Sequence, residues 1–161
     1  MSVAANPLTL PFPQHDHSHC IRTALESADA VCAARGVRLT PLRRRVLELV
    51  WQGHAPVGAY ALLEKLKGDG HSAAPPTVYR ALEFLMAQGL VHRLASLNAF
   101  VGCVHPGEPH AHQHLICRKC QTVIEIADAG IAARAREAGE GMGFIVESQT
   151  VELVGLCQAC R

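Results

Sequence analysis

The clearest chemistry in this sequence belongs to two cysteine pairs with the spacing C-x-x-C: Cys117 with Cys120, and Cys157 with Cys160. In a zinc knuckle the two thiolates of one such turn converge on a tetrahedral ion, and a second pair completes the coordination. The 36 residues between the pairs exceed the usual zinc-ribbon spacing and leave room for a helix and a strand. We therefore expect a structural Zn²⁺ site that joins the last strand to the first strand of this half.

A thiol–disulfide exchange site is the competing interpretation of these cysteines. Such a site usually has one C-x-x-C pair at the start of a helix, where the helix dipole lowers the thiol pKa. Here Cys117 follows a strand-like segment and the second pair ends the chain. This context favours the metal site.

A second group of possible ligands combines histidines with a lone cysteine and a carboxylate. Its members are His92, Cys103, His110, His112, His114 and Glu125. The three histidines of "PHAHQHLICRKC" alternate, and alternate residues of an extended segment point to one side. A thiolate, imidazoles and a carboxylate suit zinc, whereas iron(II) and manganese sites are more often made of nitrogen and oxygen alone. The plainer interpretation is a set of surface histidines beside a buried cysteine.

The cysteine count also indicates the compartment. Seven cysteines is an odd number, and four of them lie in the two C-x-x-C pairs, which favours a reducing compartment over a secreted disulfide scaffold. No run of about 18 apolar residues and no signal peptide occur, so we expect a cytoplasmic protein without a membrane partner. Residues 1–20, with "HDHSH", predict a loose tail.

The segments that precede the ligands have helical periodicity. We expect helices over residues 21–36, 38–53, 58–68 and 75–89. Thr40 should be the N-cap of the second helix, with Pro41 at its first position, and Tyr60 should face the core from the third helix. Two short apolar runs around "ASLN", within residues 90–104, predict a β-hairpin. Helices followed by such a wing outline a winged helix-turn-helix.

The fourth helix has the features of a DNA-reading helix. Its apolar positions leave Tyr79 and Arg80 off the core face, near the helix N-terminus, with Thr77 in the same turn. These are the positions that contact bases and phosphates in a helix-turn-helix. Residues 21–94 hold ten Lys/Arg against six Asp/Glu, which suits a polyanion. We expect phosphate contacts from Arg43, Arg44 and Arg45; the alternative is an ordinary helical domain with solvated basic residues.

The second half of the chain has a different pattern. Residues 114–126 predict strands around a turn at the cysteines, residues 128–143 a helix with Asp128 as N-cap, and residues 144–160 a strand with alternating polarity. The expected fold class is α+β. The expected division is a tail (1–20), a winged-helix DNA-binding domain (21–94), a hinge (95–104) and a small α/β dimerisation and metal-binding domain (105–161).

Three stretches, "RLTPLRRRVLELV", "PPTVYRALEFLMAQGLVHRL" and "HQHLICRKCQTVIEI", resemble the Fur family of metal-responsive repressors. Within that family "PPTVYRALEFL…GLVHR" and Cys103 are similar to the zinc-uptake regulators. The resemblance covers residues 21–161. It implies a homodimer that represses zinc-uptake genes from a palindromic double-stranded DNA operator, with Zn²⁺ as corepressor and two zinc ions per protomer.

The resemblance also implies roles for individual residues. The four paired cysteines would form the structural site, and Tyr79 and Arg80 would contact the operator. His92, Cys103, Glu125 and one histidine of the 110–114 group would form the sensing site. The resemblance does not decide which of these histidines is the ligand of the sensing site. It also leaves open whether one or two dimers occupy an operator. Iron-type members usually have an acidic residue at Gln113 and often a histidine at Ala111, so their additional metal site is incomplete here.

Three alternative functions are compatible with parts of this pattern. An iron or peroxide sensor would share the fold. A zinc hydrolase or thiol oxidoreductase is disfavoured, because a Cys₄ site has no open coordination position and the sequence offers no convincing nucleophile–base pair. A zinc-buffering module would bind metal through "HDHSH" and the histidine cluster without any affinity for DNA.

Overall fold

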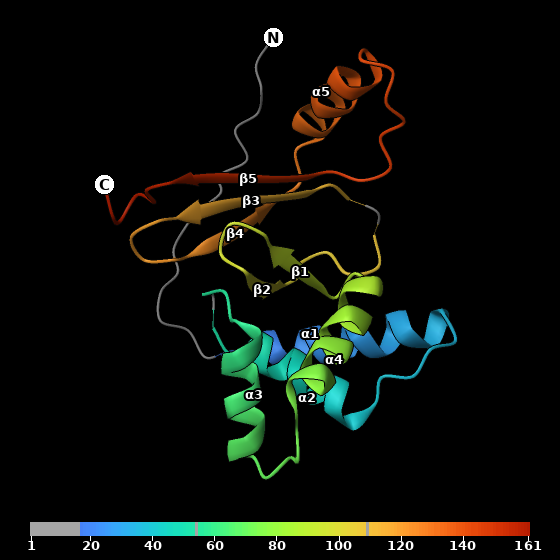
Figure 1. Ribbon diagram of the computed structural model, residues 1–161, viewed down its shortest axis with the longest axis vertical. Coiled ribbons are helices and arrows are strands. Elements are labelled where there is room, and N and C mark those ends of the chain that lie inside the picture. The colour runs from blue at the N-terminus through green and yellow to red at the C-terminus, as the bar shows by residue number, and fades with distance from the viewer. Residues whose placement is uncertain (1–16, 54, 109) are drawn as a thin grey trace.

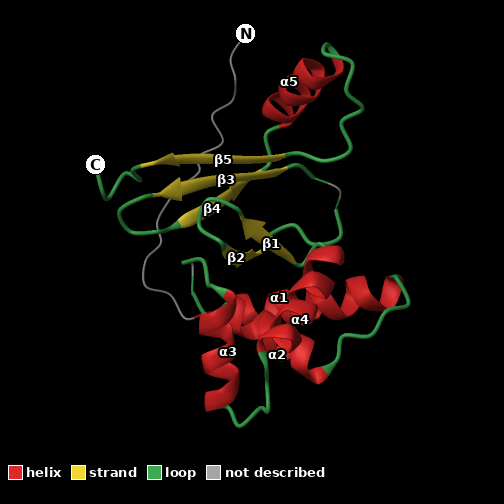
Figure 2. Cartoon of the chain, in the orientation of Figure 1, coloured by secondary structure: helices red, strands yellow, loops and turns green. Residues whose placement is uncertain are grey.

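A computed structural model describes residues 17–53, 55–108 and 110–161 of the chain. Within this part a helical half with a wing precedes a small sheet (Figures 1 and 2). The elements are α1 His17–Ala34, α2 Pro41–Val50, α3 Ala59–Gly68, α4 Pro75–Ala87, β1 Val91–Leu94, β2 Ala99–Gly102, β3 His112–Cys117, β4 Val123–Ile126, α5 Ala129–Glu140 and β5 Thr150–Gly155.

The four N-terminal helices form the expected helical half. Thr40 caps α2 by accepting a hydrogen bond from the backbone N–H of Arg43, and Pro41 fits the first turn because that position needs no N–H donor. Leucines of α3 and α4, among them Leu62, Leu66 and Leu82, are fully buried and make the centre of the core. The mixed helix-and-sheet fold class is confirmed.

Two local expectations for this half were wrong. Helix α1 begins at His17 rather than at residue 21, so the last four residues of the expected tail are helical, and residues 1–16 lie outside the described part. Tyr60 is exposed, because the buried stripe of α3 runs through Ala59, Leu62, Leu63 and Leu66 and leaves position 60 on the other side of the helix.

The wing is a two-stranded antiparallel hairpin. Strand β1 pairs with β2 from Val91 opposite Gly102 to Leu94 opposite Ala99. Asn98, with a φ of 46°, closes the turn in the left-handed region that asparagine tolerates. Figure 1 shows the wing between the helices and the second sheet. This position makes the wing the connection between the two halves.

The second sheet has the strand order β4-β3-β5, with β4 antiparallel and β5 parallel to β3. Because parallel strands end at the same edge, Cys117 at the end of β3 lies opposite Gly155 at the end of β5. Helix α5 lies in the connection between β4 and β5, and Asp128 caps it by accepting from the N–H of Ile131. The topology therefore brings two distant C-x-x-C turns to one edge.

The strand expected over residues 144–160 begins only at Thr150. The preceding segment returns beside α5: the N–H of Phe144 donates to Gly139 O, and Arg136 donates to the carbonyl of Val146. The alternation at 144–148 therefore does not mark a strand. Within the described residues, no helix combines the length and hydropathy needed to cross a bilayer.

Candidate metal centres and DNA-reading helix

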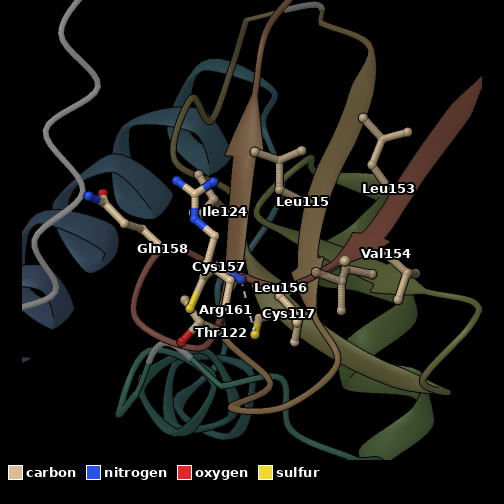
Figure 3. A pocket seen from close by; sticks show the side chains of 12 residues that line it. Leu115, Cys117, Thr122, Ile124, Leu153, Val154, Leu156, Cys157, Gln158 and Arg161 are labelled. Carbon is tan, nitrogen blue, oxygen red and sulfur yellow. Dashed lines mark hydrogen bonds between the residues drawn. The ribbon is translucent and has the colours of Figure 1, made fainter.

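The four paired cysteines meet at the edge of the second sheet. Cys117 ends β3, Cys120 closes the turn into β4, and Cys157 and Cys160 form a turn after β5. Their four sulfur atoms all lie within 4.8 Å of one another, and those of Cys120 and Cys157 are 3.7 Å apart. Figure 3 shows Cys117 and Cys157 together, with the N–H of Cys157 donating to Cys117 Sγ over 3.4 Å.

The electrostatics of these thiols are those of an anionic cluster. Backbone N–H groups of the two turns, first those of Cys120 and Cys157, lower the pKa of Cys117 to about 6. The hydrogen bond between Cys160 and Cys157, followed by burial, raises the pKa of Cys160 to about 12. Four converging thiols are a donor set that a divalent cation would stabilise as thiolates.

A second group joins the wing to the second sheet. It contains His92 from β1, Cys103 after β2, His110 before β3 and Glu125 on β4, again with ligand atoms within 4.8 Å of one another. Glu125 Oε1 lies 2.7 Å from Nε2 of His110 and 3.1 Å from Nε2 of His92, and Cys103 Sγ lies 3.6 Å from Nε2 of His110. The structure thus unites four of the six side chains expected in this group.

Burial and charge shift the pKa values of Cys103 and Glu125 in opposite directions. Burial first, and then the Glu125 carboxylate, raise the pKa of Cys103 to about 12. Burial opposes the ionisation of Glu125, but its contact with His92, the N–H of Val104 and His110 outweigh that effect and lower its pKa to about 2. A carbonyl oxygen only accepts, so His110 donates from Nδ1 to Glu108 O over 2.8 Å and turns Nε2 toward the group.

His112 and His114 lie beside His92 but outside the group of four. The ring of His112 is 4.2 Å from that of His92, and the ring of His114 is 5.4 Å from it, measured between centroids. His114 is 0% exposed, and neither of its ring nitrogens has a hydrogen-bond partner in the described residues. Burial, then the neighbouring His92, lower its pKa to about 4, so the ring is neutral at pH 7.

Gln113 faces the opposite side of β3 and anchors α5. Its side-chain amide donates to Asp128 O over 2.8 Å and accepts from Asp128 N over 3.0 Å. Both polar groups of this buried amide are thus bound to the backbone at the start of α5. Gln113 therefore offers no metal ligand at the position where iron-type members of the family usually have an acidic residue.

The N-terminal turn of α4 leaves the expected DNA-contacting side chains accessible. Val78 is buried, whereas Tyr79 is 40% exposed, Arg80 is exposed and Thr77 is half-buried. Within the part of the chain that the structure describes, Arg80 forms no ion pair. Tyr79 and Arg80 are therefore accessible to a partner.

The three consecutive arginines of α2 are engaged inside the helical half. Arg44 pairs with Asp29 of α1, and Arg45 pairs with Asp69 at 2.7 Å and with Glu48 at 2.9 Å. The guanidinium of Arg43 lies 3.6 Å from the ring centroid of Phe84. Their assignment as phosphate contacts stays a prediction, and these internal contacts weaken it.

Two features near the second group escaped the sequence reasoning. A Cβ on Gly102 would lie 2.2 Å from Cε2 of Trp51, so only glycine allows the indole to lie against the end of β2, next to Cys103. Glu152 on β5 accepts hydrogen bonds from the wing turn, through the N–H groups of Ala95 and Ser96. The rarity of tryptophan gave a weak signal for Trp51, and nothing in the sequence marked Glu152.

Comparison with known proteins agrees with this description. The profile of the ferric uptake regulator family matches residues 34–154. The zinc uptake regulation protein of Escherichia coli strain K12 is 40% identical over 137 residues, which cover 84% of this chain and 80% of the relative.

Solved structures with similar sequences also share the fold. A zinc uptake regulator complexed with zinc and DNA superposes with a TM-score of 0.82 and 38% identity, over 86% of this chain and 93% of that one. The crystal structure of holo XcZur superposes with a TM-score of 0.79 and 41% identity, over 85% of this chain and 96% of that one. The crystal structure of apo XcZur gives a TM-score of only 0.51 at 40% identity, over 87% of this chain and 97% of that one. The halves of this chain are therefore arranged more like the holo form.

Proposed function

The chain belongs to the ferric uptake regulator family, and we propose that within this family it is a zinc-responsive transcriptional repressor that binds a palindromic operator as a homodimer. The observation that carries the proposal is the group of His92, Cys103, His110 and Glu125, which draws on the wing, the hinge and the second sheet at once. We further propose that it represses zinc-uptake genes and holds two zinc ions per protomer.

Both groups of side chains fit zinc on their own chemistry. Four converging thiols form the donor set of a structural zinc site, and Cys117, Cys120, Cys157 and Cys160 would hold that ion. The second group offers one sulfur, two imidazole nitrogens and a carboxylate, and the buried Nε2 of His92 faces the Glu125 carboxylate at 3.1 Å. In each place a bound Zn²⁺ would supply a divalent charge that neutralises the anionic ligands.

The second group converts metal binding into a movement of domains. His92 moves with the wing, whereas Glu125 belongs to the second sheet, so the ligands converge only when the wing lies against that sheet. A ligand that binds one arrangement more tightly shifts the population toward it by its differential affinity. The likeness of this chain to the holo rather than the apo form of XcZur supports this assignment.

Helix α4 supplies the DNA-reading surface in this proposal. Tyr79 and Arg80, with Thr77 in the same turn, would enter the major groove, where arginine pairs bidentately with guanine and tyrosine contacts thymine methyls or phosphate. The proposed division keeps a DNA-binding domain at 21–94, a hinge at 95–104 and a dimerisation domain at 105–161.

A second copy of the chain is the partner that the C-terminal half requires. Helix α5 buries none of its residues, and large apolar side chains after it and on β5 lie open, including Ile145 at 90% exposure and Phe144 at 69%. An apolar surface of this kind in a small domain indicates a protein interface. We propose a homodimer on the operator, with a second dimer on the same operator as the alternative.

The proposal is tested by measuring DNA binding against buffered free metal. Fluorescence anisotropy of an AT-rich palindromic duplex would be recorded with Zn²⁺, and with Fe²⁺ and Mn²⁺ under anaerobic conditions. We expect binding to rise with free zinc at concentrations where the other two metals have no effect. An equal response to all three metals would point to an iron or peroxide sensor, and metal binding without DNA affinity to a zinc buffer.

A further inference from the structure

Three side chains form one row across the second sheet. His114 on β3 is paired with Glu125 on β4 and with Glu152 on β5, so all three project from the same face. That face meets the wing, because Glu125 contacts His92 of β1 and Glu152 binds the turn between β1 and β2. The row thus has a carboxylate at each end, and each carboxylate holds a different part of the wing.

The contact made by Glu152 is well defined. Its Oε1 accepts from the N–H of Ala95 over 2.6 Å, and its Oε2 accepts from the N–H of Ser96 over 3.1 Å. A carboxylate that bridges two successive backbone N–H groups makes two charge-assisted hydrogen bonds and fixes the orientation of the turn. Glu152 is 57 residues from Ala95 along the chain, so the contact belongs to the arrangement of the two halves rather than to local structure.

We propose that Glu152 is a positioning residue of the zinc response: it clamps the wing turn onto β5 and thereby holds His92 at the second metal group. This inference rests on the proposed function. Ala95 follows β1, which carries His92, so a turn held at Ala95 fixes the strand on which His92 stands. Glu152 lies outside the group of four ligands and acts through the position of His92.

The consequence for zinc affinity follows from linkage. The four ligands converge when the wing is docked, so the apparent affinity for zinc equals the intrinsic affinity reduced by the docked fraction. The Glu152 clamp raises that fraction before any metal binds. Its removal should therefore weaken zinc binding at the second group even though every ligand is present, and it should leave the Cys₄ group unchanged.

Trp51 provides an internal reporter of docking. It is the single tryptophan of the chain. A small cavity of about 60 Å³ is lined by Trp51 and Gly102 on one side and by His114, Val123 and Glu125 of the second sheet on the other. Separation of the wing from the sheet would open this cavity to water and change the emission of the indole.

The test compares Glu152→Ala with Glu147→Ala in the full-length protein without DNA. Glu147 is an exposed glutamate just before β5 and is the matched control. Trp51 emission would be followed against buffered free Zn²⁺. We expect the zinc midpoint of Glu152→Ala to rise about tenfold, from the loss of two hydrogen bonds to a charged group partly compensated by water. The zinc midpoint of Glu152→Gln, which keeps one acceptor oxygen, should lie between those of wild type and Glu152→Ala.

The outcomes separate this inference from the function on which it rests. Midpoints of both Glu152 variants within about twofold of wild type, with a clear zinc response in the wild type, would overturn the clamp alone. A wild type without any zinc response would overturn the proposed function and the clamp with it. Thermal unfolding, together with the zinc content after mild chelation, checks that the variants are folded; a folded variant should retain one zinc ion per protomer. If the zinc midpoint rises in a variant that has also lost its structural zinc, the result would count against the clamp.

Discussion

The contact between Gly102 and Trp51 leads to a quantitative prediction for Gly102→Ala. The added Cβ would lie 2.2, 2.3 and 2.6 Å from three atoms of the indole, closer than any real Cβ contact, so the ring must move. Trp51 packs against the core of the helical half, and its displacement gives up part of that packing. Overpacking of this kind typically costs about 1–3 kcal/mol in the free energy of unfolding, and we expect a loss in that range.

Urea unfolding followed by Trp51 fluorescence and by circular dichroism would measure this loss. The matched control is Gly68→Ala at the end of α3, where an added Cβ meets nothing within 4 Å. We expect the control to stay within about 0.5 kcal/mol of wild type or to be slightly stabilised. An unchanged unfolding midpoint and unchanged emission in Gly102→Ala would refute the packing of the indole against this glycine.

Gly102→Ala should also weaken the zinc response, because Gly102 precedes Cys103, a proposed zinc ligand. Three further changes test other parts of the molecule. Cys160→Ser should unfold the second sheet, seen as lost strand signal in circular dichroism, and release both zinc ions, because Glu125 of the second group lies on that sheet; a folded variant with full zinc content would contradict the Cys₄ assignment. Arg80→Ala should cost about 1–3 kcal/mol of operator binding, measured by anisotropy beside Lys67→Ala, an exposed cation on α3, as control; equal losses in both would argue against α4 as the reading helix. Ile145→Asp should yield folded monomers in sedimentation analysis, because a charge is harmless on the exposed monomer and costly inside an interface; a retained dimer would exclude this surface as the interface.

Much of the fold could be predicted from local signals. Thr40 and Asp128 each marked a helix start through a side chain that caps free N–H groups, and both caps are present. The start of β5 could not be predicted, because the alternating polarity of residues 144–148 is typical of a strand although β5 begins at Thr150. The carbonyl of Val146 is bound by Arg136 of α5 instead, a contact that no local pattern announces.

The two metal groups were predictable to different degrees. A C-x-x-C spacing is itself the geometry of a knuckle, so the four cysteines could be assigned from sequence, and the structure brings all four together. Alternation could not separate His110 from His112 and His114, because the choice depends on where β3 begins. Strand β3 starts at His112, which leaves His110 in the preceding loop, free to turn its Nε2 toward Cys103. Glu152 was not predictable at all, since its role depends on the pairing of β5 beside β3.

The most direct test of the central claim is operator binding by Cys103→Ser against buffered free Zn²⁺, compared with wild type and with Cys32→Ala. Cys32 is buried in the helical core, outside both metal groups, and serves as the control for removal of a cysteine. We expect the zinc midpoint of Cys103→Ser to rise at least about tenfold, since mutations in and around a metal site commonly cost about 10–100-fold in affinity, while Cys32→Ala matches wild type. A Cys103→Ser protein with a wild-type zinc midpoint would contradict the assignment of His92, Cys103, His110 and Glu125 as the zinc-sensing site.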